Sequence, residues 1–284
     1  MTLDEEIVGR PAPGFAGRGG RRTPVGALRD GGGQLIRLYR SRALSTGLVP
    51  HLAFFALPVG QRVGSFQLEG YPFFARGTDW RGVENVALRR EFEFILPLLA
   101  GGRPVVVDVG ANIGMFSLYA FLANRDAIVH ALEPSPDTFD LLRRNSRANP
   151  GLAWSCYHAA VHAGDGVVYV DDQADSTARR VCPREGDEVP SFSLRTLLTR
   201  YVESRVRLLK ITVEGSEEAV LAGNEDLLSR VDHLVVELHP GECRTDRVVA
   251  AVLDAFPRLY EVPRRGARKP LLLATRTPVD LPRF

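Results

Sequence analysis

The sequence predicts an α/β fold in which helices cover both faces of a doubly wound, mostly parallel sheet. Three observations support this prediction. From residue 101 onward, short apolar runs typical of buried strands alternate with segments of helical periodicity. The first apolar run leads directly into a turn that contains Gly110 and Gly114, and two further short runs close the chain. Alternation of this kind is typical of parallel sheets, and a terminal antiparallel hairpin favours the seven-stranded version.

The individual elements follow from local patterns. Apolar residues at helical spacing over 83–100, followed by Gly101-Gly102, predict an amphipathic helix that ends there. β-Branched and apolar runs predict strands at 104–109, 127–132, 152–158, 206–213 and 233–239. Helical periodicity, with Ser, Thr or Pro at most of the starts, predicts helices at 113–123, 135–148, 193–201, 216–228 and 245–256. Shorter runs predict an exposed ribbon at 166–170 and a hairpin at 258–262 and 270–274.

The chain divides by composition into three regions. Residues 1–33 are rich in glycine, proline and arginine, which predicts a flexible tail; the alternative is a tail that becomes ordered over a bound substrate. Residues 34–100 begin with helical spacing around Leu35 to Tyr39 and predict a small helical cap, or lid. Residues 101–284 hold the alternating pattern and are expected to form the ligand-binding domain.

Charge and hydropathy exclude several classes of protein. The 36 Lys and Arg residues nearly balance the 34 Asp and Glu residues, and the net charge of +2 gives no general attraction to nucleic acid or to an anionic membrane. The apolar run Leu52 to Val59 is much shorter than the roughly 20 residues of a transmembrane helix. The acidic N-terminus has no apolar signal region, and the 3 cysteines, Cys156, Cys182 and Cys243, include no CxxC pair. We therefore expect a cytoplasmic protein without disulfides.

The turn after the first core strand predicts a ligand that carries an ammonium group and a carboxylate. Gly110 and Gly114 permit a tight turn, and the helix that follows presents N–H groups suited to an anion. The spacing does not match the dinucleotide fingerprint G-x-G-x-x-G, and Asp108 would repel a diphosphate. Glu133 ends the next strand, near the offset of about 20 residues at which an acid accepts ribose hydroxyls. A nucleoside amino acid such as S-adenosylmethionine fits this order; alternatively, the glycines serve packing and Glu133 merely ends a strand.

Four blocks in the chain closely resemble the FkbM-type family of S-adenosylmethionine-dependent methyltransferases. In chain order they are VVVDVGANIGMFSL, ALEPSPDTFDLLRRN, LLKITVEGSEEAVLAG and VVELHP. The resemblance covers roughly residues 83–262. It implies the class I methyltransferase fold, S-adenosyl-L-methionine as cofactor, and O-methylation of hydroxyls on natural products or sugars.

The resemblance also implies roles for individual residues. Those expected to hold the methionine end of the cofactor are Asp108, Gly110, Asn112 and Gly114. Glu133 would hold the ribose and Pro134 would shape the turn after it, while Ala160 and Val161 would lie along the adenine. Glu214 would face the methyl group, with Glu237 and His239 on the same rim.

This chain departs from the family pattern at Thr212. The family commonly reads K-I-D-V-E-G where this chain has KITVEG, so one carboxylate is missing. His239 is our first candidate for a compensating general base, because imidazole titrates near neutral pH, and Glu214 is the second. The alternatives are that His239 only ends a strand and that Glu214 only stabilises the start of a helix.

We expect no metal ion. His158 and His162 have a spacing that suits metal ligands on a helix, but they fall across a strand end and a loop. The basic pairs 179–180, 264–265 and 268–269 are interpreted as solvated loop charges, or as a site for an acidic acceptor. The aromatic residues before the core, including Phe66 and Phe73, are interpreted mainly as packing.

The sequence therefore predicts O-methylation of a small or carrier-bound acceptor. N-methylation of an amine or guanidine is an alternative, because acidic residues flank the expected methyl position. A non-catalytic, cofactor-binding protein is another, because of Thr212. No nucleic-acid or membrane partner is expected, a nicotinamide dehydrogenase is disfavoured, and the acceptor and the oligomeric state stay open.

Overall fold

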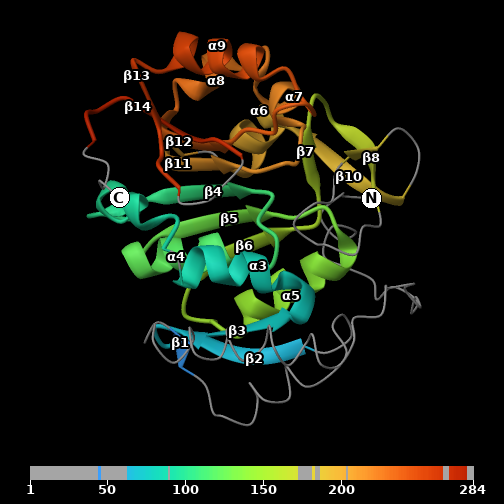
Figure 1. Ribbon diagram of the computed structural model, residues 1–284, viewed down its shortest axis with the longest axis vertical. Coiled ribbons are helices and arrows are strands. Elements are labelled where there is room, and N and C mark those ends of the chain that lie inside the picture. The colour runs from blue at the N-terminus through green and yellow to red at the C-terminus, as the bar shows by residue number, and fades with distance from the viewer. Residues whose placement is uncertain are drawn as a thin grey trace.

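A computed structural model describes residues 44–45, 63–88, 90–171, 181–182, 186–202, 204–264 and 269–279. Within these ranges a central sheet lies between two layers of helices, and a small N-terminal sheet packs beyond one of the layers (Figure 1). The predicted tail at 1–33 and most of 34–62 lie outside the described residues.

The central sheet has seven strands in the order β13-β14-β12-β11-β4-β5-β6. Their bounds are β4 Val105–Val109, β5 Ile128–Leu132, β6 Ala153–Tyr157, β11 Val206–Ile211, β12 Val231–Glu237, β13 Arg258–Glu261 and β14 Leu271–Thr275. Every pairing is parallel except the two made by β14, which runs antiparallel to both neighbours. The doubly wound sheet, its seven strands and its terminal antiparallel hairpin are therefore confirmed.

The strand order creates a switch point in the middle of the sheet. From β4 the chain moves outward through β5 to β6, and then returns to the other side of β4 to form β11 and β12. Connections that leave two adjacent parallel strands in opposite directions open a crevice beyond their carboxyl ends, where ligands bind in such sheets. In this chain the switch point lies between β4 and β11, so the expected ligand site is at the edge beyond Val109 and Ile211.

Alternating side chains of the strands feed two separate cores. Val106 faces a core that includes residues of α4 and α5, whereas Val105, Val107 and Val109 face a core shared with α6 to α9. The bounds of the helices are α3 Trp80–Val83, α4 Met115–Ala123, α5 Pro136–Arg147, α6 Leu194–Thr196, α7 Glu217–Leu221, α8 Glu225–Leu228 and α9 Thr245–Ala255. Figure 1 shows α6 to α9 on one side of the sheet and α3 to α5 on the other. A strand buried on both faces explains the unbroken apolar runs in the sequence.

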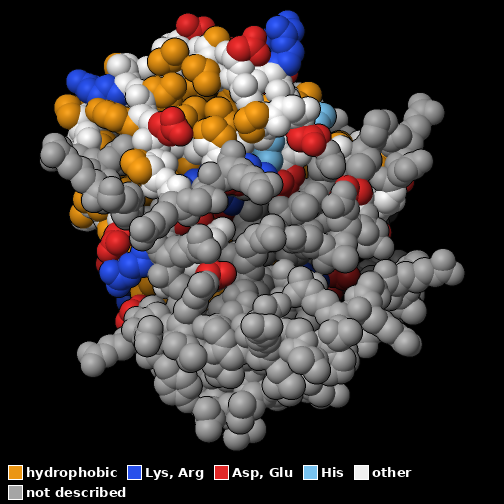
Figure 2. Space-filling model, in the orientation of Figure 1, with side chains coloured by type: hydrophobic (Ala, Val, Ile, Leu, Met, Phe, Trp, Pro, Cys, Tyr) orange, Lys and Arg blue, Asp and Glu red, His pale blue; other side chains and the backbone are white. Residues whose placement is uncertain are grey.

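Hydrophobic side chains also reach the outer surface of the layer that contains α8 and α9. Figure 2 shows them gathered in the upper part of the molecule, where Figure 1 places these helices. Leu253 on α9 is an example, with 54% of its surface exposed. Exposed apolar side chains are normal on globular proteins, because more than half of their accessible surface comes from apolar atoms.

A four-stranded sheet is inserted between β6 and β11, in the order β7-β10-β8-β9. Its strands are β7 Ala160–His162, β8 Gly166–Val170, β9 Val181–Cys182 and β10 Asp187–Ser193. The prediction found only the ribbon at 166–170, since β7 and β9 are too short to show a pattern and β10 contains a proline, Pro190.

The described part of the expected helical cap begins as a β-sheet, which corrects that prediction. Strands β1 Leu44–Ser45, β2 Val63–Leu68 and β3 Tyr71–Arg76 form an antiparallel sheet. Phe66 and Phe73 face each other across β2 and β3, with ring centroids 5.3 Å apart, so their predicted packing role is confirmed. The buried side chain of Asn145 on α5 bonds to both the N–H and the carbonyl of Phe74, which fixes this sheet to the domain.

Two predicted helices are broken into shorter pieces. The segment 83–100 contains the end of α3, a π-helical turn η2 Glu84–Leu88, and the 3-10 turns η3 Glu93–Ile95 and η4 Pro97–Leu99. Arg90 has a left-handed φ of 53°, and Pro97 has no N–H to continue a helix, so the apolar spacing marks the buried face without giving a continuous helix. The predicted helix at 216–228 divides into α7 and α8 around Gly223, whose φ is 73°.

The helices begin close to the predicted residues, but only some of the predicted capping hydrogen bonds form. Ser193 caps α6 as expected, because its hydroxyl oxygen accepts the N–H of Thr196 at 3.1 Å; the π-helical turn η5 Leu197–Tyr201 follows α6. Ser135 occupies the N-cap of α5 with Pro136 as the first helical residue, but its side chain makes no capping bond. Thr245 is the first residue of α9, not its cap.

Two further sequence expectations concern cysteines and membranes. Cys156 and Cys243 are free thiols, and nothing is described for the side chain of Cys182. Burial raises the pKa of Cys156 to about 12, which makes it unreactive as a thiolate. Among the residues described, no helix combines the length and the apolar character that a membrane span requires.

Candidate active site at the carboxyl edge of the sheet

The glycine turn lies at the switch point and has the left-handed backbone that its sequence suggested. Gly110, Asn112 and Gly114 have φ values of 73°, 52° and 88°. A Cβ added at Gly110 would lie 1.9 Å from the carbonyl oxygen of Thr212, and one at Gly114 would meet the ring of Trp154. Both glycines are thus required by contacts within the protein, and their predicted contact with the methionine end of a cofactor stays a prediction.

Asp108 is completely buried at the end of β4. Its Oδ2 accepts the hydroxyl of Ser117 at 2.7 Å, and Lys210 Nζ lies 3.0 Å from its Oδ1. Lys210 is also buried and donates to the carbonyl of Gly110 at 2.7 Å, which ties β11 to the turn. Asp108 therefore stabilises the turn through Lys210, which bonds to the Gly110 carbonyl. Direct contact between Asp108 and a ligand ammonium stays a prediction.

Glu133 joins the turn to the end of β5. Its Oε2 accepts the backbone N–H of Asn112 at 2.8 Å, and its Oε1 accepts that of Ser135 at 3.0 Å. These two bonds fix the orientation of the Glu133 side chain at the end of β5, and its predicted contact with a ribose stays a prediction.

The other residues predicted to contact the cofactor, Pro134, Ala160 and Val161, make contacts within the protein. The Pro134 carbonyl accepts a hydrogen bond from His158 Nε2 at 2.9 Å, and the His158 ring stacks on Phe139. Ala160 and Val161 are buried in β7 and pack inside the protein. Their predicted positions along an adenine stay a prediction, and His158 faces Pro134 and Phe139 instead of a metal partner.

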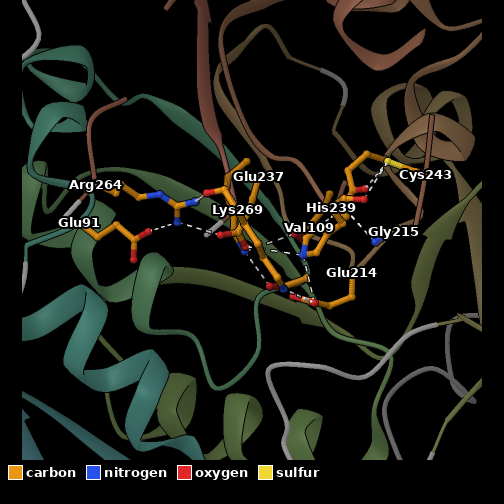
Figure 3. A network of polar contacts seen from close by, with 12 residues as sticks. Glu91, Val109, Glu214, Gly215, Glu237, His239, Cys243, Arg264 and Lys269 are labelled. Atoms are coloured by element: carbon orange, nitrogen blue, oxygen red, sulfur yellow. Dashed lines mark hydrogen bonds and ion pairs between the residues drawn. The ribbon is translucent and has the colours of Figure 1, made fainter. Parts of the chain in front are cut away.

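A second group of polar residues lies beyond the ends of β11 and β12, with His239 at its centre (Figure 3). His239 Nδ1 lies 2.7 Å from Glu217 Oε1, and His239 Nε2 lies 3.0 Å from Glu214 Oε2 and 3.9 Å from Glu237 Oε2. Glu217 is fully buried and also accepts the N–H of Gly215 and the thiol of Cys243. The structure thus brings together the two predicted catalytic residues, His239 and Glu214.

Basic side chains complete this network on its outer side. Lys269 Nζ lies 2.6 Å from Glu214 Oε2, and Arg264 Nη1 lies 2.8 Å from Glu237 Oε1. Arg264 also pairs with Glu91, so the row in Figure 3 runs from Glu91 to Cys243. Arg264 and Lys269 are therefore paired with carboxylates, which corrects the interpretation of both as solvated loop charges; Arg179, Arg180, Arg265 and Arg268 lie outside the described residues.

The carboxylates determine the protonation of His239. Burial alone would lower the pKa of His239, but the adjacent Glu214 and Glu217 outweigh burial and raise the pKa to about 9. Burial would raise the pKa of Glu214, yet His239 and Lys269 hold it below its ordinary value. At neutral pH this arrangement contains an imidazolium between carboxylates. Because an imidazolium cannot accept a proton, the role of His239 as general base stays a prediction that requires the ring first to lose its proton.

Sequence reasoning missed several members of this network. Glu217 is separated from His239 by a helix and a strand, and its only signal was an acid in the first turn of a predicted helix. The two lysines of the chain, Lys210 and Lys269, both contact carboxylates of the site, although no role was predicted for Lys210 and Lys269 was interpreted only as a loop charge or part of an acceptor site. A lysine in an apolar strand was a usable signal for Lys210, because a buried lysine needs a partner.

Fold and site together define a class of protein. Seven strands in this order, with only the penultimate position in the sheet antiparallel and a glycine turn and an acid at the ends of β4 and β5, constitute the class I methyltransferase fold. A family model described as the methyltransferase FkbM domain matches residues 108–260, which is more than half of the chain. The chain belongs to the FkbM methyltransferase family.

Named relatives agree with this assignment. The chain is 32% identical over 157 residues to the hexuronic acid methyltransferase AglP of Haloferax volcanii, covering 54% of this chain and 64% of that protein. It is 33% identical over 183 residues to the 31-O-demethyl-FK506 methyltransferase FkbM of Streptomyces tacrolimicus, covering 51% of this chain and 69% of that protein. The matches thus span about two thirds of each relative and about half of this chain.

A solved structure of an rRNA methylase from Streptococcus thermophilus superposes with a TM-score of 0.42 at 14% identity, covering 66% of this chain and 95% of that one. Similarity at this level adds nothing to the fold assignment, which rests on the strand order.

Proposed function

We propose that this chain is an S-adenosylmethionine-dependent methyltransferase that methylates a hydroxyl oxygen of a small natural-product or sugar-like acceptor. One observation carries the proposal: the glycine turn and Glu133, at the ends of β4 and β5, lie at the same edge of the sheet as the His239 network beyond β11 and β12. Membership of the FkbM methyltransferase family supports it.

The residues present fit the cofactor. Glu133 is held in place by the backbone N–H groups of Asn112 and Ser135, at the end of β5, where a carboxylate suits the hydroxyls of a ribose. The left-handed turn from Gly110 to Gly114 leads into the N-terminus of α4, where the helix dipole favours the carboxylate of a bound amino acid. S-adenosylmethionine would supply a methyl group that is already activated on a sulfonium.

The acceptor is expected to bind against Glu214, Glu237 and His239. Register places Ile211 beside both Val109 and Val236, so the residues that follow β11 and β12 lie at the same edge as the glycine turn. Carboxylate oxygens there can accept a hydrogen bond from an acceptor hydroxyl, and the imidazolium of His239 can donate one. Positioning of this kind contributes about 7–11 kcal/mol in well-oriented cases.

This proposal does not depend on a carboxylate at position 212. General-base catalysis contributes typically about 10²–10⁴-fold, less than orientation can supply. The names of two relatives, a hexuronic acid methyltransferase and a 31-O-demethyl-FK506 methyltransferase, support oxygen-rich acceptors.

Calorimetric titration of the full chain with S-adenosylmethionine and S-adenosylhomocysteine tests the cofactor site. We expect both to bind, and Glu133→Gln to weaken binding about 10–100-fold, since hydrogen bonds to a charged group are worth about 1.5–3 kcal/mol. Glu261→Gln, an exposed acid on β13, is the matched control and should bind as the wild type does. No measurable affinity for either nucleoside would overturn the proposal.

A panel of hydroxylated and amino acceptors, read by mass spectrometry, tests the reaction. A mass gain of one methyl group on a hydroxylated acceptor supports O-methylation. Product on amines alone would replace it with N-methylation, and cofactor binding without product across the panel would favour a non-catalytic protein.

A further inference from the structure

Three side chains from two strand ends converge on one point at the carboxyl edge of the sheet. Glu214 follows β11, Glu237 ends β12 and His239 lies two residues beyond it. Each offers one potential metal-ligand atom, and these atoms all lie within 4.8 Å of one another. We refer to Glu214, Glu237 and His239 as the edge triad.

The His239 ring is buried, and its orientation is fixed by a neighbouring carboxylate. The side chain is only 3% exposed, and Nε2 faces Glu214 Oε2 at 3.0 Å in an ion pair that lacks the geometry of a hydrogen bond. The other ring nitrogen, Nδ1, is held at 2.7 Å by the fully buried Glu217. A carboxylate on the far nitrogen is the arrangement that orients metal-binding histidines and directs the free nitrogen at the ion.

The backbone and exposure of the two acids also suit a ligand. Glu214 has a left-handed φ of 48°, which is uncommon for a residue with a side chain and concentrates at functional sites. The side chains of Glu214 and Glu237 are 18% and 16% exposed, so an ion can reach them from solvent although His239 is buried.

Cations already occupy part of this environment. Lys269 Nζ lies 2.6 Å from Glu214 Oε2, the same oxygen that faces His239 Nε2. Arg264 pairs with the other oxygen of Glu237, Oε1, and leaves Oε2 directed toward His239. The flexible ammonium of Lys269 can move aside, whereas Arg264 would remain as a partner that fixes Glu237.

We propose that the edge triad binds a divalent transition-metal ion, such as Mn²⁺ or Zn²⁺, through His239 Nε2 and one carboxylate oxygen each from Glu214 and Glu237, and that Lys269 competes with the ion. One imidazole and two carboxylates form a mixed nitrogen and oxygen set that suits these ions. Binding replaces the proton on Nε2, since only the neutral imidazole ligates a metal.

Such an ion would lie at the edge where the acceptor is expected. There it would bind an acceptor oxygen directly and favour its deprotonated form, which is a recognised contribution of metals to catalysis. Metal binding itself does not depend on the proposed function, and it is measured on the chain without cofactor.

Titration of the full chain with Mn²⁺, followed by the loss of the electron paramagnetic resonance signal of free Mn²⁺, tests the proposal. We expect one tightly bound Mn²⁺ per chain, displaced by Zn²⁺. Glu237→Gln replaces a carboxylate ligand by a neutral amide, and Glu217→Gln removes the carboxylate that orients His239. Each should weaken binding about 10–100-fold. Lys269→Met removes the competing charge and should strengthen binding.

Glu218→Gln is the matched control, because Glu218 follows Glu217 directly but pairs with Arg247 outside the edge triad. Circular dichroism spectra and melting curves verify that each variant is folded. If the wild type takes up neither Mn²⁺ nor Zn²⁺, or if Glu237→Gln and Glu217→Gln bind as tightly as Glu218→Gln, the proposal is overturned. Metal binding without cofactor affinity would reject the proposed function alone.

Discussion

Gly110 and Gly223 have the same backbone φ but differ in the space available for a side chain. Both have a φ of 73°, but a Cβ at Gly110 would lie 1.9 Å from Thr212 O, whereas nothing lies within 4 Å of one at Gly223. Gly110 therefore serves two needs, the left-handed turn and the close approach of the β11 end to the β4 end. The sequence predicted the first need, and only the structure shows the second.

Gly110→Ala and Gly223→Ala should consequently differ in their effect on stability. Gly223→Ala introduces only left-handed strain, about 1–2 kcal/mol in the free energy of unfolding. Gly110→Ala adds a steric overlap with backbone, which costs about 1–3 kcal/mol more. Urea denaturation of both variants measures the difference, and equal losses would contradict the contact with Thr212.

At the same scale, the pairing of charged side chains in the site could not be derived from the sequence. Glu217 is the first residue of α7, and the rest of α7, α8 and β12 separate it from His239. Lys269 reaches Glu214 from the loop that joins β13 to β14. Strand endings placed Glu214, Glu237 and His239 on one rim, but the partners depend on how loops fold over that rim.

At the scale of elements, Asp165 fixes the junction of the inserted sheet and α6. It lies in the loop between β7 and β8, where its Oδ1 accepts the N–H of Ser193 at 2.7 Å and its Oδ2 the hydroxyl of Thr196 at 2.6 Å. The backbone N–H of Ser193 is the main reason that the pKa of Asp165 is below its ordinary value. The folded protein therefore binds this proton less readily than the unfolded chain does.

This lowered pKa predicts the sign of a pH effect. Asp165 should stabilise the fold fully above about pH 4, the region of an unperturbed Asp, and lose that contribution as the pH falls through the lower folded pKa. Asp165→Asn should be less stable than the wild type at pH 7, and the difference should vanish toward pH 2. Urea denaturation from pH 2 to pH 7 tests this, and a constant difference would reject it.

For the segment 83–100, the sequence predicted correctly which side chains are buried, but the predicted continuous helix was wrong. Val86, Phe92, Ile95 and Leu99 are all buried, as the spacing over 83–100 predicted. Periodicity reports which side chains are buried, and short helical turns connected by a left-handed residue such as Arg90 preserve that spacing.

At the scale of the whole molecule, the pair Asp108 and Lys210 lies in the middle of the central sheet. Register aligns the two residues across β4 and β11, the strands on either side of the switch point, and both are buried. Lys210→Met leaves the Asp108 carboxylate buried with only Ser117 as a hydrogen-bond partner. Loss of one partner of a buried pair typically costs about 3–5 kcal/mol.

Global urea denaturation of Lys210→Met should show a loss of this size, because the pair lies between the two main cores. The double variant Asp108→Asn with Lys210→Met should recover much of the stability, since no buried charge remains. Arg195→Met, which breaks an exposed pair with Asp226, is the control and should cost about 0–1 kcal/mol. A loss for Lys210→Met no larger than for this control would contradict the buried pairing.

The sequence by itself determined the alternation of strands and helices in the central sheet, the glycine turn at the end of β4, the acid at the end of β5, and the family. These features are local or periodic, because backbone sterics and burial act on neighbouring residues. Only the tertiary structure decided that Asp108 turns inward to Lys210, that a carboxylate holds each side of His239, and that a sheet stands where a helical cap was expected. Such contacts join residues far apart in the chain, and their energies depend on distances and burial that no local pattern encodes.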